Sequence, residues 1–195
     1  MSGTLLQCRR GARHLARGVA RAAEVRDHRS VVSELIAFTD GGCRGNPGVG
    51  AWAFALVDPK TRKALERAGG EPETTNNRME MWAAIEALTA SRKPGDHLLI
   101  RTDSKYLIGC CTEWMAGWKA NGWKRKGDPL KTLELLQKLD GLLTGRNVKF
   151  RWVAGHSGHV GNDHVDLLAN EAMDRIAAGR DPAHERRFEW TGPLG

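Results

Sequence analysis

Four acidic residues stand at positions where a chain of mixed helices and strands could bring them together. Asp40 and Asp103 each follow an apolar stretch typical of a strand, whereas Glu80 and Asp166 lie near the starts of two expected helices. Because functional sites of α/β proteins usually lie at the carboxyl edge of the sheet, we expect the four carboxylates to converge there. Taken singly, each acid also has an ordinary structural role in a turn, a helix cap or a first helical turn.

Carboxylates that share one pocket repel each other, and a phosphodiester substrate would add another negative charge. Protonation or bound cations must relieve that repulsion. Oxygen-only ligands favour Mg²⁺, with Mn²⁺ as a substitute. Two such ions about 4 Å apart could hold an attacking water and a leaving oxygen in line. The four acids therefore predict a two-metal site that hydrolyses phosphodiesters.

The hydrophobic pattern predicts the elements that must position these acids. Helix and strand periodicities alternate along the chain, with glycine-rich or proline-containing breaks between them. The expected strands are 31–39, 50–57, 62–68, 98–100 and 148–152, and the expected helices start near Asn77, Tyr106, Leu133 and Asn162. Asn77 and Glu80 have the spacing of a capping box. The order β-β-β-α-β-α-α-β-α predicts an α/β fold, a five-stranded mixed sheet flanked by helices.

Five short motifs surround the acids in a fixed order. They are TDGGCRGNPG at 39–48, TTNNRME at 74–80, TDSKY at 102–106, WVAGHSGH at 152–159 and NDHVDLLA at 162–169. This set closely resembles ribonuclease HI, over about residues 33–178. The resemblance implies the ribonuclease H-like fold and an endonuclease that cuts the RNA strand of RNA–DNA hybrids, leaving 5′-phosphate and 3′-hydroxyl ends. It also implies that Asp40, Glu80, Asp103 and Asp166 bind the metal ions, with Asp40 best placed to bridge both.

His156 lies in a loop that contains Gly155, Gly158 and Gly161. A histidine in such a loop is often only a surface residue. The resemblance instead implies a catalytic histidine, acting either as a mobile general base or as a group that assists release of product and metal. Zinc is not expected, because no companion cysteines or metal-binding histidine spacing accompany it.

Two further groups of residues are expected to hold the substrate. Tryptophans interleave with basic residues in a segment that resembles the basic protrusion, or handle, of many bacterial ribonucleases HI; the residues expected to contact the DNA strand are Trp114, Trp118, Lys119, Lys124 and Lys126. Stacking and phosphate contacts suit such a surface, although the tryptophans could also be core residues below a solvated face. By resemblance, Cys43, Asn46 and Asn76 line the minor groove of the hybrid, and Thr75 lies near a phosphate.

The net charge and the composition indicate how the chain is divided and where the protein is located. The net charge is +7, and residues 1–30 contain seven arginines and two acids. That leader could be a mitochondrial transit peptide, a flexible basic extension or an untranslated upstream stretch. We expect an extension at 1–32, a catalytic domain at 33–180 and a tail at 181–195. The four cysteines lack metal-binding spacing and are expected to be reduced thiols of an intracellular protein. No apolar run is long enough to span a bilayer, so no membrane partner is expected. We expect a monomer in the cytoplasm, or in the mitochondrion if the leader is a transit peptide.

Other functions sharing the acid cluster have to be weighed. A structure-selective nuclease or a transposase-like enzyme normally carries further DNA-binding domains, and 195 residues leave no room for one. A reverse-transcriptase domain would be expected to have flanking domains. A hybrid-binding module without activity would not need all four acids and His156. We therefore expect an RNA–DNA hybrid as the partner and an active enzyme.

Overall fold

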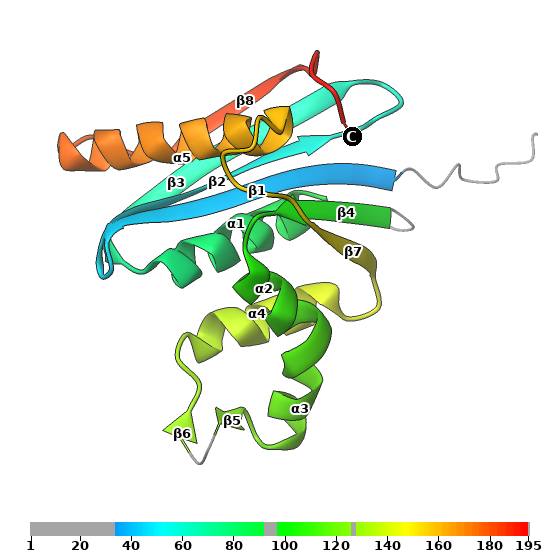
Figure 1. Cartoon of the computed structure of the whole chain (residues 1–195), viewed down its shortest axis with the longest axis vertical. Coiled ribbons are helices and arrows are strands. Elements are labelled where there is room, and N and C mark those ends of the chain that lie inside the picture. The colour runs from blue at the N-terminus through cyan, green and yellow to red at the C-terminus, as the bar shows by residue number, and fades with distance from the viewer. Residues whose placement is uncertain (1–33, 92–96, 126–127, 195) are drawn as a thin grey trace, which may run out of the picture.

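The computed structural model describes residues 34–91, 97–125 and 128–194, which form a mixed sheet with helices on both faces (Figure 1). The strands of the main sheet lie in the order β7-β4-β1-β2-β3-β8. The strands are β1 (Glu34–Gly45), β2 (Gly48–Val57), β3 (Lys63–Thr74), β4 (His97–Thr102), β7 (Asn147–Trp152), β8 (His184–Glu189) and the short pair β5 (Lys124–Arg125) and β6 (Asp128–Pro129). The helices are α1 (Asn76–Ala90), α2 (Lys105–Gly109), α3 (Met115–Ala120), α4 (Leu133–Leu143) and α5 (Val160–Ala177), with a π-helical turn η1 (Cys110–Trp114).

The two faces of the sheet carry separate apolar clusters because side chains alternate along a strand. On β1, Ala37 belongs to the cluster shared with α1 and α4. Its neighbours Ile36 and Phe38 belong to the cluster shared with α5. Figure 1 shows α5 on one side of the sheet and α1 with α4 on the other. The predicted α/β class and the mixed, helix-flanked sheet are confirmed.

β1 is longer than the sequence predicted, and this decides where Asp40 lies. The parallel ladder between β1 and β4 ends at the pair Phe38 and Arg101. The antiparallel ladder with β2 continues past it, through Asp40 opposite Ala53, to Gly45 opposite Gly48. The predicted glycine-rich turn is therefore mostly strand, and only its tip turns. Asp40 lies just beyond the point where β1 loses β4 as a neighbour.

The five-stranded sheet was wrong by one strand, because part of the expected C-terminal tail pairs with the edge of the sheet. β8 runs antiparallel to β3, with His184 opposite Ala68 and Glu189 opposite Lys63. The segment has few apolar residues, so its sequence does not alternate as a half-buried strand should. Two of its side chains, His184 and Arg186, instead donate hydrogen bonds to Glu66, a buried acid of β3. No pattern in the sequence predicts that β8 would pair with β3.

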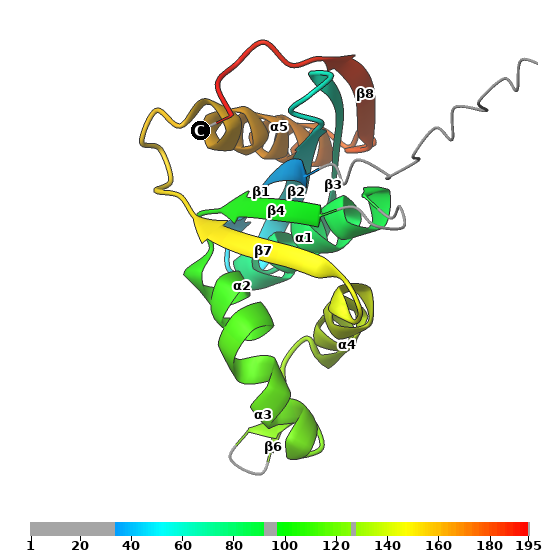
Figure 2. The same cartoon turned by 90° about the vertical axis from the view of Figure 1, so that its right-hand side faces the viewer.

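Residues 106–125 and 128–130 belong to the predicted handle, which projects from the body below β7 and α4 (Figure 2). α2, η1 and α3 follow one another without a break, and β5 and β6 close the tip. The π-helical turn η1 adds a local irregularity at Cys110 and Cys111, between the part that packs on the body and the part that projects.

Several expectations fall on residues that the structure does not describe: the basic extension 1–32, the first of the four cysteines and Lys126. Among the described residues, Cys43, Cys110 and Cys111 are free thiols, as expected. No helix in the described part of the chain is long and apolar enough to cross a membrane.

Glu66 joins three elements from a buried position. Its side chain is 1% exposed and accepts hydrogen bonds from His164 of α5 at 2.7 Å and from His184 and Arg186 of β8 at 2.9 and 2.7 Å. Burial by itself raises the pKa of Glu66, but the bonds from Arg186, His184 and His164 outweigh burial and hold the pKa below its ordinary value of 4.5. A buried acid with this many partners stabilises the fold only while it is ionised.

We predict that Glu66→Gln destabilises the protein most at neutral pH. A depressed pKa contributes stability that is present above the unfolded-state pKa and is lost as the pH falls through the folded-state pKa. Urea unfolding at pH 7 should show a loss of about 2–4 kcal/mol, shrinking towards pH 3. Glu185→Gln, which removes an exposed ion pair of β8 with Arg67, is the control and should cost well under about 1 kcal/mol. A loss for Glu66→Gln that is equal at pH 7 and pH 3 would contradict the prediction.

Candidate active site

Asp40 lies at the centre of the predicted site, next to the first turns of α1. A Cβ atom on Gly41 would lie 2.2 Å from the backbone nitrogen of Glu80, so α1 can approach β1 this closely only because residue 41 is glycine. The Asp40 carboxylate accepts a 2.8 Å hydrogen bond from the Gly41 N–H. The close approach of α1 to β1 at Gly41 brings Glu80 beside Asp40, although one acid lies on a helix and the other on a strand.

Glu80 is held by its two carboxylate oxygens, not by a helix cap. Oε2 accepts a 2.6 Å bond from the Ser104 hydroxyl, and Oε1 accepts a 2.9 Å bond from the Asn76 amide. The capping box predicted from Asn77 and Glu80 is wrong, because α1 begins one residue earlier with Thr75 as its N-cap. Glu80 therefore lies beyond the capping position and is free to face the sheet edge.

Asp103 and Asp166 reach the same place from β4 and α5. Asp103 directly follows Thr102, the last residue of β4, so it ends the strand next to β1 as predicted. A Cβ atom on Gly155 would lie 2.5 Å from Oδ2 of Asp103, so the loop that carries His156 packs directly against this acid. Asp166 accepts a 3.0 Å bond from the Asn170 amide one turn further along α5. Asp166 lies in the second turn of α5, which begins at Val160, two residues before the expected start near Asn162.

His156 is exposed, and its Nδ1 lies 3.6 Å from Oδ2 of Asp166. Its backbone has a positive φ of 51°, which is uncommon for a residue other than glycine and is found at strained functional loops. The other two histidines nearby have structural partners. His159 is the N-cap of α5, and His164 bonds to Glu66.

Burial and mutual repulsion raise the pKa values of three acids. The pKa of Asp40 rises from 3.8 to about 7, through burial first and then through the charges of Asp103, Asp166 and Glu80. The pKa of Glu80 rises from 4.5 to about 7, mainly through burial, against the bonds that it accepts. The pKa of Asp103 is raised mainly by burial. Such a cluster needs protons or cations to offset its charge.

The donor set fits a hard divalent cation, although the metal-free side chains are not arranged as a finished coordination shell. Among the described residues, no group of three His, Cys, Asp or Glu side chains is placed to hold a metal ion as it stands. In particular, both carboxylate oxygens of Glu80 accept hydrogen bonds, from Ser104 and Asn76. All four candidate ligands offer carboxylate oxygens, and burial, with a smaller contribution from mutual repulsion, raises the pKa values of three of them, so a nearby cation would stabilise their ionised forms.

The predicted groove residues lie together beside Glu80. The Asn46 side chain accepts a 3.3 Å bond from the Asn76 N–H, which ties the tip of the β1–β2 hairpin to the start of α1. Thr75 occupies the N-cap position of that helix, and its side chain makes no capping hydrogen bond. The Cys43 thiol lies 3.3 Å from the Thr74 carbonyl oxygen, between the two segments. The structure therefore brings Cys43, Asn46, Thr75 and Asn76 into one surface next to the acids.

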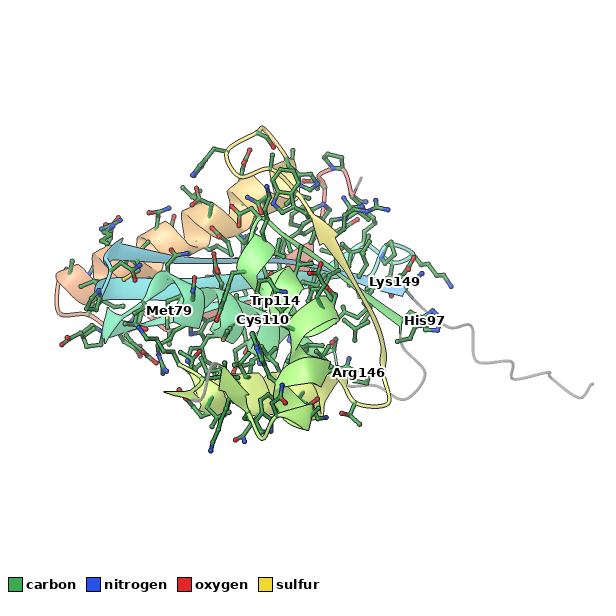
Figure 3. All side chains as sticks on the ribbon, turned by 60° about the horizontal axis from the view of Figure 1, so that its bottom comes forward. Met79, His97, Cys110, Trp114, Arg146 and Lys149 are labelled. Carbon is green, nitrogen blue, oxygen red and sulfur yellow. The ribbon has the colours of Figure 1, made fainter. Side chains whose placement is uncertain are left out.

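The handle residues are divided between packing and exposure. The rings of Trp114 and Trp118 lie 5.8 Å apart, and Tyr106 lies 5.9 Å from Trp114. Trp114 is 40% exposed (labelled in Figure 3), whereas Trp118 packs partly against the core. These aromatics line a pocket of about 430 Å³. Lys124 is exposed, but Lys119 is bound to both carboxylate oxygens of Asp140 at 2.8 Å.

Two residues at the site were not singled out from the sequence as functional. Ser104 both caps α2 and donates to Glu80, and its position directly after Asp103 could have revealed it. Trp152 is 47% exposed and donates a 3.1 Å bond to the Asp103 carbonyl oxygen. The Lys105 ammonium lies 4.9 Å from the centre of the Trp152 ring, a cation–π contact.

Comparison with known proteins gives one consistent family. The family model described as RNase H matches residues 32–174. A protein named Ribonuclease H from Alcanivorax borkumensis is 46% identical over 146 residues, covering 74% of this chain and 95% of the relative. The solved structure of LC9-RNase H1, a type 1 RNase H with the type 2 active-site motif, has a TM-score of 0.66 at 30% identity, covering 73% of each chain. LC11-RNase H1, solved in complex with RNA/DNA hybrid, has a TM-score of 0.57 at 26% identity, covering 73% of this chain and 99% of that one.

We predict that Asp40→Asn stabilises the metal-free protein at alkaline pH. A carboxyl group whose folded-state pKa is raised costs stability once the pH exceeds its unfolded value of 3.8, and the cost is complete above about 7. Urea unfolding in EDTA should show a gain of about 2–4 kcal/mol at pH 8 and almost none at pH 4. Glu171→Gln, an exposed acid of α5, is the control for loss of one negative charge. An equal gain at both pH values would contradict the explanation by repulsion.

Proposed function

Because the chain belongs to the ribonuclease H family, we propose that it is an Mg²⁺-dependent endonuclease that hydrolyses the RNA strand of RNA–DNA hybrids at the Asp40, Glu80, Asp103 and Asp166 site. The observation that carries the proposal is the convergence of these four acids, from β1, α1, β4 and α5, at one edge of the family's fold. The products are a 5′-phosphate and a 3′-hydroxyl end. Divalent metal ions are general for the family, and Mg²⁺, with Mn²⁺ as a substitute, is the choice that fits an all-carboxylate site.

Asp40 is the acid best suited to bridge two ions. Its pKa is raised by the charges of all three other acids, so it lies electrostatically at the centre of the cluster. Glu80, Asp103 and Asp166 would complete the shells. When bound, two divalent ions supply an activated water and stabilise charge on the leaving 3′ oxygen. Ser104 and Asn76 orient Glu80 in the metal-free site, so a bound ion would have to compete with these two hydrogen bonds for the Glu80 oxygens.

His156 is proposed as the group that moves protons or assists release at the edge of the site. Its exposure and its 3.6 Å distance from Asp166 allow it to face both solvent and a bound phosphate. As a general base it would accept a proton from the attacking water. As a release group it would compete for the Asp166 carboxylate after cleavage. Both roles need the loop position that the positive φ of His156 provides.

Choice of the hybrid is proposed to come from the groove surface and the handle. Cys43, Asn46 and Asn76 offer a thiol, amides and backbone N–H groups that can read 2′-hydroxyl groups through the wide minor groove. The complex of LC11-RNase H1 with RNA/DNA hybrid supports this class of substrate. The exposed Trp114 and Lys124 of the handle suit stacking and phosphate contacts with the DNA strand. Because Lys119 is bound to Asp140, Lys124 is the better candidate for a phosphate contact.

We predict that the purified protein cleaves only the RNA of a hybrid, in the presence of Mg²⁺. RNA–DNA hybrid, double-stranded RNA and double-stranded DNA are offered with Mg²⁺ or with EDTA, and products are resolved on gels. Asp40→Asn should lower cleavage at least about 1000-fold, because the central metal carboxylate is lost. Its folding is checked by the stability measurement above.

Two results would overturn this function. Hybrid binding without cleavage by the native protein would leave a binding module and not an enzyme. Cleavage of double-stranded RNA at the same rate would remove the specificity for hybrids, while keeping the nuclease activity.

We predict that Lys124→Ala weakens hybrid binding in a salt-dependent way. Loss of one phosphate contact should lower the slope of log affinity against log salt concentration by about 1. Fluorescence anisotropy with Asp40→Asn as the background measures binding without cleavage. Lys119→Ala is the matched control and should change the slope less, because Asp140 already neutralises Lys119. Equal slopes for all three proteins would exclude Lys124 from the phosphate contacts.

A further inference from the structure

The chain beyond α5 returns to the start of that helix. After β8, the segment 190–194 crosses from the β3 edge towards the first turn of α5 (Figure 2). This segment follows the residues 32–174 that match the family model. From its contacts, we propose that Trp190 is a positioning residue that seats the first turns of α5 on β1, and so sets the place of Asp166 relative to Asp40. The inference rests on the proposed metal-binding role of these two acids.

Trp190 fills the space between β1 and α5. It is 3% exposed, and its ring stacks on Phe38 at 5.4 Å with an interplanar angle of 18°. The His164 ring meets it edge-on at 5.3 Å, with an angle of 79°. Phe38 lies two residues before Asp40, and His164 lies two residues before Asp166. One indole ring therefore contacts both elements that carry the two acids.

The backbone of the segment is fixed by Arg62, in the turn between β2 and β3. The Trp190 N–H donates to the Arg62 carbonyl oxygen at 2.7 Å, and the Arg62 guanidinium donates to the Trp190 carbonyl oxygen at 2.9 Å. A further guanidinium nitrogen donates to the Gly192 carbonyl oxygen. Arg62 makes these bonds from a positive φ of 61°. Since a non-glycine residue with positive φ is costly, these bonds offset local strain and hold the indole in a fixed register.

The position of Asp166 relative to Asp40 depends on how the first turns of α5 pack on β1. Its amide partner Asn170 lies on the same helix, and the further link from Asn170 to Arg44 of β1 is an exposed contact at the hairpin end of that strand, at 3.5 Å. The first turns of the helix pack closely on β1, where a Cβ atom on Gly161 would lie 2.3 Å from the Phe38 ring. The Phe38 ring thus contacts both Gly161 of α5 and Trp190. Without the indole, Phe38 and α5 would gain freedom to shift, and metal sites tolerate only about 0.5 Å of such movement.

The test compares Trp190→Ala with the native chain in two measurements. The first is the Mg²⁺ concentration that gives half-maximal cleavage at saturating hybrid, which should rise about 3- to 10-fold, as expected when groups supporting a metal ligand are lost. Hybrid affinity, measured in EDTA, should remain within about twofold, since the groove residues and the handle do not contact Trp190. The second is amide hydrogen exchange of residues 160–166 without metal, which should become faster than in the native chain.

Control variants separate positioning from simple loss of stability. Leu142→Ala, in α4 on the other face of the sheet, removes a core side chain and should leave both the Mg²⁺ dependence and the exchange of residues 160–166 unchanged. Trp190→Phe keeps a ring against Phe38 and should restore most of the native Mg²⁺ dependence. If Trp190→Ala does not fold, Arg62→Ala takes its place, because it cuts the bonds to Trp190 and Gly192 without opening a cavity under Phe38.

Native Mg²⁺ dependence together with native exchange in a folded Trp190→Ala or Arg62→Ala protein would overturn the inference. So would an equal Mg²⁺ shift in Leu142→Ala. A native chain that cleaves no hybrid would instead refute the proposed function. The exchange of residues 160–166 would still decide whether Trp190 seats α5, since that measurement needs neither metal nor substrate.

Discussion

The structure depends on holding mutually repelling carboxylates together at one partly buried edge of the sheet. Burial and the other three acids raise the pKa of Asp40 to about 7, so the metal-free site costs free energy at neutral pH. That cost is offset elsewhere, by apolar clusters on both faces of the sheet and by ladders that fix β1 between β2 and β4. The same repulsion makes the site a strong place for cations, because binding relieves it.

The four acids can lie together only because elements on both faces of the sheet reach the same edge. α1 supplies Glu80 from one face, and it comes close enough only because Gly41 has no side chain. α5 supplies Asp166 from the other face, seated on Phe38. Bonds from Ser104 and Asn76 orient Glu80, while the His156 loop packs on Asp103 through Gly155. The acids are thus placed by close backbone contacts, which hold distances better than long flexible side chains would.

The handle, which we propose to contact the DNA strand, is spatially separate from the acids. The acids lie at the edge of the sheet, on strands and helices packed together, whereas the handle projects away from the sheet (Figure 1). Contacts to phosphates act over a distance and are screened by salt, so the handle can vary in charge without disturbing the acids. The C-terminal strand serves the opposite need. It ties α5 to β3 through Glu66 and, by our inference, keeps the catalytic geometry fixed through Trp190.

The sequence by itself determined the class of fold, the four acids and the family resemblance, because periodicity and short motifs are local properties of the chain. It also predicted β7 and the handle. It did not determine β8, since a strand held by His184 and Arg186 on the buried Glu66 has no apolar alternation. It misplaced the start of α1 and could not show that Lys119 is bound to Asp140. Those features were decided only by tertiary structure, because each depends on a partner far away in the sequence.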